Sequence, residues 1–330
     1  MIEKYYSGVI EQIYNRIGKE TRNIVMANYS NDFSIENLEV IRRYQSNEDN
    51  VFFAYSEFSY NTLVGAYEPF LDIICNMHRR FIGGSFDDFQ KECGVYYLHR
   101  QVLNSYYETG ECFREETVLL NEVAYEQRRM TMAIADMLKR LSEVRPLMIV
   151  INRFQMASKS SIETIKYLID NPCANIGIVL GVNAIVKGTD STVEVWDRIV
   201  ESLEDRSAIY YIGSAGSLKN NIKNTNDDEL YITTNFEQSI QEASNIMEFL
   251  DFEQARRGCR IIEHKLKFED AWIDEKSLRR FYLVYARTCV LLGEMSKAIE
   301  LTNEYKALIP ENDSEHYLSL YYFMKGTCYM

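Results

Sequence analysis

The stretch that decides the fold runs from Arg145 to Ser161 and reads RPLMIVINRFQMASKSS. Its centre, Leu147–Ile151, is an uninterrupted apolar run, which is typical of a strand buried on both faces of a parallel sheet. Pro146 ends the helix expected before this run, and the polar residues after it lead into a helix expected over 161–168. The segment therefore predicts one strand–turn–helix unit of an α/β domain.

Similar units lie on both sides of this segment, after a first helix expected over 2–17. Further strands are expected over 23–27, 51–55, 176–180 and 208–212, and further helices around 35–41, over most of 66–145, including a charged helix at 114–140, and over 193–203. Strands that alternate with helices predict a mostly parallel sheet covered on both faces. We expect this α/β domain to occupy residues 1–213.

The turn after the first strand is the place where a parallel α/β sheet would bind a phosphate group. The phosphate-loop pattern G-x-x-x-x-G-K-[ST] needs glycines for a close backbone, a lysine for the terminal phosphate and a hydroxyl for magnesium. Ala27 and Asp32 stand at the two glycine positions, Phe33 replaces the lysine, and Ser34 keeps the hydroxyl. The register fits, but Asp32 would repel phosphate.

The 145–161 segment resembles the Walker B region of signal-transduction ATPases (the STAND class), which include large LuxR-type regulators and the maltotriose-responsive activator. The family pattern is an apolar strand, two acidic residues, a bulky residue, His or Gln, Trp, Ala, Asp, and two Ser before a helix. Asn152 and Arg153 fall on the acidic positions, Met156 on the Trp and Ser158 on the Asp.

Two further segments add to this resemblance, which covers roughly residues 20–215. Tyr67–Phe70 is similar to a Tyr-x-Pro-Phe segment that follows the second strand of those proteins, and Asn183 lies where the family often has an arginine. The resemblance implies a P-loop NTPase-like sheet with flanking helices. It also implies a degenerate nucleotide site at Ala27, Asp32, Phe33, Ser34, Asn152 and Arg153.

The substitutions at this site predict that the chain does not hydrolyse nucleotide. An arginine at 153 stays protonated and cannot activate an attacking water, and the phosphate-loop lysine is missing as well. Two alternatives remain open: a site that still binds nucleotide without hydrolysis, and a buried strand and capped helix unrelated to nucleotide. Tyr29 and Phe33 could instead fill the phosphate pocket.

The C-terminal part is expected to be all α-helical and similar to tetratricopeptide repeats. A linker is expected over 214–234, followed by helices over 235–330, with one repeat at 279–310, a weaker helix pair at 243–252 and 253–267, and a further helix at 321–329. Packing positions of the repeat are taken by Tyr282, Tyr285, Ala286, Gly293, Ala298 and Pro310, whereas Thr302 is smaller than usual. Because the array stops mid-unit, we expect it to continue in a longer protein.

The composition excludes several classes of function. A net charge of -13 without a basic stripe argues against nucleic-acid binding by this segment. The seven Cys are scattered without a CxxC, and the four His are isolated from one another, so reduced thiols and no metal site are expected. Neither a signal peptide nor a membrane-spanning run is present in the sequence, which predicts a cytoplasmic protein.

These observations favour a non-catalytic regulatory or scaffold protein, as part of a transcriptional or signalling regulator. The α/β domain would be a pseudo-ATPase platform without a required cofactor, and the helices would bind a protein partner or a small effector. A homo-oligomer is compatible with the sequence, and no membrane partner is expected. The alternative is a nucleotide-binding switch with little or no hydrolysis of ATP; an unrelated enzyme has no supporting set of residues.

Overall fold

A computed structural model describes most of the chain. The described residues are 2–29, 38–46, 50–59, 63–113, 122–183, 193–212, 236–268, 273–310 and 314–329. The chain forms two compact units. The first comprises Met1–Tyr60, Tyr67–Arg100 and Arg128–Thr225, and the second comprises Asn61–Ala66, Gln101–Gln127 and Asn226–Met330. The second unit thus takes in two segments that lie far upstream of the expected linker 214–234, which itself falls outside the described residues.

The described part of the first unit is built on a parallel sheet of five strands in the order β2-β3-β4-β1-β5. The strands are β1 Ile24–Tyr29, β2 Phe52–Glu57, β3 Leu147–Asn152, β4 Ile176–Asn183 and β5 Ile209–Ile212. Every residue of β3 and β4 is buried, because helices cover both faces of the sheet. The predicted parallel α/β architecture is confirmed, with strand bounds that differ from the predicted ones by three residues at most.

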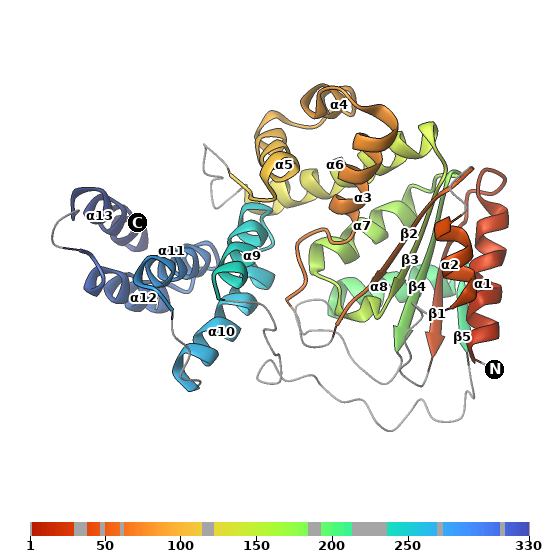
Figure 1. Ribbon diagram of the computed structural model, residues 1–330. Coiled ribbons are helices and arrows are strands. Elements are labelled where there is room, and N and C mark those ends of the chain that lie inside the picture. The colour runs from red at the N-terminus through yellow and green to blue at the C-terminus, as the bar shows by residue number, and fades with distance from the viewer. Residues whose placement is uncertain are drawn as a thin grey trace. The chain divides into compact units, whose positions relative to one another are not determined.

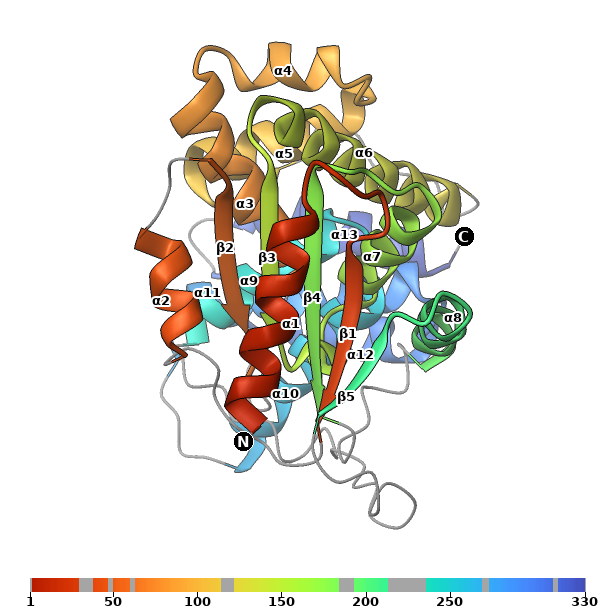
Figure 2. The same cartoon turned by 90° about the vertical axis from the view of Figure 1, so that its right-hand side faces the viewer.

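The handedness of the crossover connections decides which face each helix covers. The chain passes from β1 to the distant β2 in one direction, and then through β3 and β4 to β5 in the opposite direction. Right-handed crossovers therefore place α2 Glu39–Ser46 on one face, and α7 Lys159–Asp170 and α8 Val193–Glu204 on the other. Figures 1 and 2 show this arrangement, with the N-terminal α1 Ile2–Arg16 on the same face as α2.

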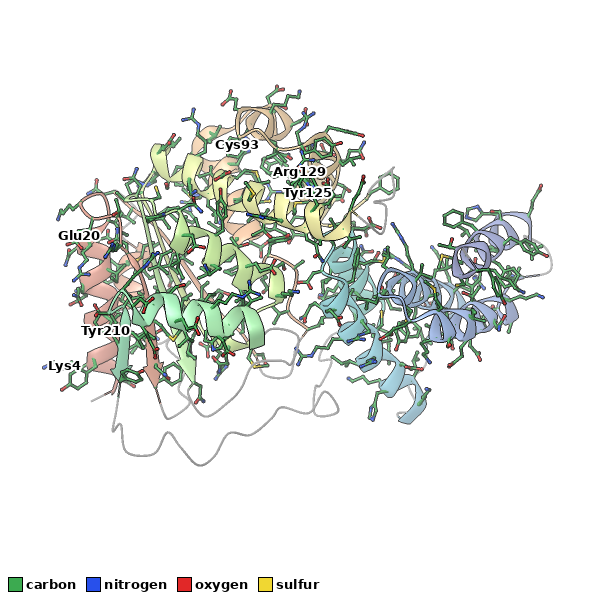
Figure 3. All side chains as sticks on the ribbon, turned by 180° about the vertical axis from the view of Figure 1, so that it is seen from behind. Lys4, Glu20, Cys93, Tyr125, Arg129 and Tyr210 are labelled. Atoms are coloured by element: carbon green, nitrogen blue, oxygen red, sulfur yellow. The ribbon has the colours of Figure 1, made fainter. Side chains whose placement is uncertain are left out.

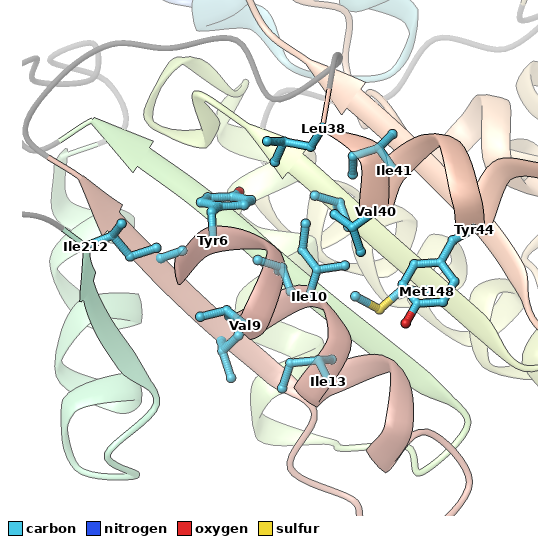
Figure 4. Packing of buried hydrophobic residues seen from close by; sticks show 14 of the residues in the cluster. Tyr6, Val9, Ile10, Ile13, Leu38, Val40, Ile41, Tyr44, Met148 and Ile212 are labelled. Carbon is cyan, nitrogen blue, oxygen red and sulfur yellow. The ribbon is translucent and has the colours of Figure 1, made fainter. Parts of the chain in front are cut away.

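The core on the α1 face is continuous from α1 and α2 to the sheet. Tyr6, Ile10 and Ile13 of α1 are fully buried and pack with Ile41 of α2 and Met148 of β3 (Figure 4). Gly177 of β4 makes room for this helix, because a Cβ there would lie 2.8 Å from the side chain of Ile17. The helical periodicity of residues 2–17 therefore reflects a real buried face.

The region between β2 and β3 is mostly helical in its described part, as predicted for 66–145, and it is divided into several helices. It contains α3 Phe70–Met77, a π-helical turn His78–Ile82, α4 Phe86–Glu92, α5 Tyr97–Thr109 and α6 Val123–Val144. Gly83 and Gly84 have φ values of 67° and 74°, in the left-handed region that ends a helix. The charged helix expected at 114–140 begins at Val123 and continues to Val144, and residues 114–121 lie outside the described residues.

From residue 236 onward, the described residues of the second unit form helices. It contains α9 Phe236–Glu248, α10 Phe252–Phe268, α11 Glu275–Leu291, α12 Met295–Ala307 and α13 Ser314–Cys328. Helix α9 ends at Glu248, four residues before the predicted end of the first helix at 252, and Leu250 in the turn that follows has a φ of 67°. The helix predicted over 321–329 begins earlier, at Ser314.

Helices α11 and α12 form the hairpin predicted over 279–310. Gly293 lies in the turn with a φ of 76°, and Ala298 is fully buried where the two helices meet. The small Thr302 is buried as well, and its hydroxyl donates to the Ala298 carbonyl at 2.7 Å. In the described part of the chain, no helix is both long and apolar enough to cross a membrane.

Candidate functional site

The candidate site lies at the carboxyl edge of the sheet, toward which the strand arrows point in Figure 2. At this edge Tyr29, the last residue of β1, pairs in register with Asn183, the last residue of β4. The connection after β1 leads to a helix on one face, and the connection after β4 leads to a helix on the other. Such a switch point is where parallel α/β sheets bind ligands. Asn152 ends β3 beside it, and Glu57 ends β2.

Asn152 is fully buried, and its amide oxygen is already engaged within the protein. The Tyr29 hydroxyl donates a hydrogen bond to Asn152 Oδ1 at 2.6 Å. Gly181 of β4 allows this arrangement, because a Cβ there would lie 2.8 Å from Asn152 Oδ1 and even closer to the Tyr6 hydroxyl. Tyr6 thus reaches from α1 over Gly181 to the same polar cluster.

Arg153 is held beside this cluster by an ion pair. It adopts a left-handed backbone conformation with a φ of 54°, which directs the chain into the turn after β3. Its guanidinium Nη1 lies 3.0 Å from Glu57 Oε1 and donates to the Phe58 carbonyl at 3.3 Å. The Tyr55 hydroxyl donates to the other Glu57 oxygen. The Arg153 charge is therefore balanced by a half-buried carboxylate of the neighbouring strand.

Gln155 connects the turn after β3 to the end of β4. It is buried, and its Oε1 accepts a hydrogen bond from the Asn183 N–H at 3.3 Å. Its Nε2 is also buried, and it donates to no group in the part of the chain that the structure describes. Asn183, predicted to stand at an arginine position of the family, therefore contributes a backbone contact to the cluster.

The Tyr67–Phe70 segment, which adds to the family resemblance, meets the serines of the 145–161 segment at the start of α7. The Tyr67 N–H donates to Ser160 Oγ at 3.0 Å, and the Ser161 hydroxyl donates to the Glu68 carbonyl at 2.8 Å. Ser158 caps α7, since its side chain accepts a hydrogen bond from the Ser161 N–H. The serines before this helix thus anchor the Tyr67–Phe70 segment.

The Tyr6 hydroxyl stays protonated. Burial, followed by the nearby Tyr29, Tyr55 and Glu57, raises the pKa of Tyr6 well above its ordinary value. A neutral Tyr6, the neutral Asn152 and the paired Arg153 and Glu57 leave no net charge at this part of the edge. The described cluster is therefore a polar network without net charge, in which Asn152 Oδ1, Arg153 and Glu57 all have protein partners.

These residues do not fit a magnesium-bound nucleotide. Magnesium is held by carboxylate and water oxygens, whereas Asn152 offers an amide oxygen that already accepts from Tyr29, and Arg153 adds a positive charge. Ala27 is fully buried inside β1. Asp32, Phe33 and Ser34 fall outside the described residues, so their expected places in the loop stay predictions. No group of three or more possible metal ligands occurs among the described His, Cys, Asp and Glu.

Sequence reasoning identified Asn152, Arg153 and Tyr29 but missed Tyr6, Tyr55 and Glu57. The signal for Glu57 was its place directly after an apolar strand, where a charged residue reaches the edge of the sheet. Tyr6 gave no such signal, because its spacing is that of an ordinary core position of α1. No family model matches this chain, and no similar protein was found among curated proteins.

Proposed function

We propose that this protein is a non-catalytic regulatory or scaffold protein, with a pseudo-ATPase platform followed by a helical binding unit. One observation carries the proposal: both residues at the expected acidic positions are engaged by the protein itself. Asn152 accepts from Tyr29, and Arg153 pairs with Glu57. Phosphoryl transfer needs a metal-holding carboxylate and a group that orients water at these positions, and each missing part typically lowers the rate about 10²–10³-fold.

The resemblance to STAND-class ATPases gains support from contacts between segments that are distant in the sequence. The Tyr67–Phe70 segment is bonded to Ser160 and Ser161, as expected if both belong to one ancestral NTPase-like module. The strands that would carry the phosphate loop and the Walker B residues are separated only by β4 in the sheet. These observations favour a module that keeps the strand arrangement of an NTPase-like domain but lacks the residues that phosphoryl transfer needs.

The helical unit supports the binding half of the proposal. Helices α11 and α12 pack in a hairpin around Phe281, Tyr285 and Ala298. Helix α13 exposes Tyr322 and Phe323, each with more than three-fifths of its surface accessible. Exposed aromatic residues are enriched at protein–protein interfaces, so we assign partner or effector binding to this unit.

Equilibrium binding of fluorescent ATP and ADP, with and without magnesium, tests the platform. We expect no binding tighter than ~10 µM, which corresponds to about 7 kcal/mol, and no steady-state hydrolysis. A tighter, magnesium-dependent complex would favour the nucleotide-binding switch instead. Hydrolysis that Asn152→Ala abolishes, but the surface substitution Arg140→Gln on α6 leaves intact, would refute the pseudo-ATPase assignment.

A further inference from the structure

A cavity of the first unit lies at the opposite, amino-terminal edge of the sheet. It has a volume of about 210 Å³ and is formed by the turn from α1 into β1, the end of α7 and the turn from α8 into β5. β1 spans Ile24–Tyr29, so this cavity is roughly 17 Å along the strand from the carboxyl edge. It is therefore separate from the Asn152 cluster and independent of the proposed function.

The polar wall of this cavity carries charges of both signs. Arg16, Arg22 and Arg206 line it together with Glu20. Arg206 is held in place because its Nη1 donates to the Ile169 carbonyl at 2.5 Å, and Arg16 Nε lies 3.6 Å from Glu20 Oε2. Arg22 is exposed, and no ion pair to it occurs within the described ranges. A carboxylate or phosphate group would find guanidinium donors on this wall.

The same cavity also offers acceptors for a positively charged group. Asn23 lines it and is fully buried; its Nδ2 donates to the Glu20 carbonyl and, at 3.2 Å, to the Ala174 carbonyl. Its Oδ1 accepts no hydrogen bond from the residues that the structure describes but is closed to solvent, whereas the carboxylate of Glu20 on the same wall is exposed. Three helices, α1, α7 and α8, end at this cavity. Each C-terminus carries a partial negative charge of about half a unit.

The remaining wall is apolar. Leu168, Ile169 and Leu203 line it but are almost fully buried, so its accessible apolar part is formed by Pro172, after α7, and Tyr210 of β5. The cavity volume equals that of about seven water molecules in the liquid. This space can hold a compact molecule with a short branched side chain. Tyr210 of β5 and Glu20 of the α1–β1 turn, both labelled in Figure 3, also line the cavity.

We propose that this cavity binds a small zwitterion with an apolar body, namely a free apolar α-amino acid. Its carboxylate pairs with Arg22 and Arg206, its ammonium group faces the carboxylate of Glu20, and its side chain packs on Pro172 and Tyr210. Charges of both signs around one small apolar cavity distinguish this ligand class from a simple anion, which the three helix C-termini would disfavour.

Isothermal titration of the full chain with L-leucine tests the site, with two single-charge analogues as comparison. We expect 4-methylpentanoate, which lacks the ammonium, and 3-methylbutylamine, which lacks the carboxylate, each to bind on the order of tenfold or more weakly than leucine, because each loses a charge-assisted contact. If either analogue binds as tightly as leucine, the zwitterion assignment is wrong.

The location is tested with a matched pair of arginine variants. Arg22→Gln should weaken leucine binding about tenfold or more. Arg140→Gln, which changes the charge equally at an exposed residue of α6 paired only locally with Glu143, should leave binding unchanged. In two-dimensional NMR spectra, leucine should shift the side-chain amide signals of Asn23. Equal binding by both variants, or shifts confined to other regions, would overturn the proposal.

Discussion

Gly181→Ala is the most informative perturbation of the carboxyl-edge cluster. A Cβ at this position would lie within 3.0 Å of both the Tyr6 hydroxyl and Asn152 Oδ1, a separation that real Cβ atoms essentially never show. The Asn152 oxygen is held by the Tyr29 hydroxyl, and Tyr6 is a fully buried residue of α1. Neither neighbour is the free end of a flexible side chain, so α1 or β3 must shift.

The expected cost follows from overpacking a closed site. Forcing an extra methyl group into a packed core typically costs about 1–3 kcal/mol. The lower backbone entropy of the unfolded alanine chain offsets about 0.4–1 kcal/mol of this. We therefore expect Gly181→Ala to destabilise the first unit by roughly 1–2 kcal/mol, which lowers its unfolding temperature by about 2–4 °C per kcal/mol.

A second substitution identifies Tyr6 as the clashing group. Tyr6→Phe removes the hydroxyl and leaves the ring carbon Cζ at 3.3 Å from the position that the alanine Cβ would take. The stability change of this single variant is measured as the reference for the pair. Combined with Gly181→Ala, Tyr6→Phe should cost about 1 kcal/mol less than the sum of the two single changes, because the two groups are in direct contact.

Urea denaturation monitored by Trp196 fluorescence measures this effect. Trp196 lies in α8 of the first unit, and a Trp272→Phe background removes the chain's other tryptophan. Gly8→Ala is the matched control: Gly8 is on α1, a Cβ there meets nothing within 4 Å, and alanine should stabilise the helix by up to about 1 kcal/mol. Equal stabilisation by both alanine variants, or strict additivity of the Gly181 and Tyr6 changes, would refute the described packing.

Three further predictions concern both units. Ala298→Leu should lower the stability of the second unit by about 1–3 kcal/mol, measured by chemical denaturation, because Ala298 is fully buried in the α11–α12 contact. Burial raises the pKa of Cys75 to about 12, so iodoacetamide at pH 8 should label it only after unfolding, as read by mass spectrometry. Burial opposes the ionisation of Glu263, but hydrogen bonds from Lys267 and Lys297 outweigh it and lower its pKa. Ionised Glu263 therefore adds stability above about pH 4.5 that is lost as the pH falls through the lowered value; acid titration of Glu263→Gln should show a smaller loss, and an unchanged profile would contradict this.

The sequence was informative where burial leaves a local pattern. Leu147–Ile151 predicted a central strand because a strand covered on both faces must be apolar at consecutive positions, and β3 is buried throughout. Helical periodicity also predicted a mostly helical region over 66–145, but it did not give the bounds of the separate helices, one of which begins after Gly83 and Gly84. Periodicity reports which residues face a core, but it does not report a left-handed backbone turn between two helices.

The parallel α/β architecture and the presence of an amide and a guanidinium group, Asn152 and Arg153, at the end of β3 were determined by the sequence alone, because strand burial and side-chain charge are local properties. Only the tertiary structure decided how these residues are used. Tyr29 and Asn152, 123 positions apart, meet because β4 alone lies between their strands and has no Cβ at Gly181. Glu57 reaches Arg153 because β2 and β3 are neighbours. Such contacts depend on the order of the strands and on the distances between atoms, and neither produces a periodic pattern in the sequence.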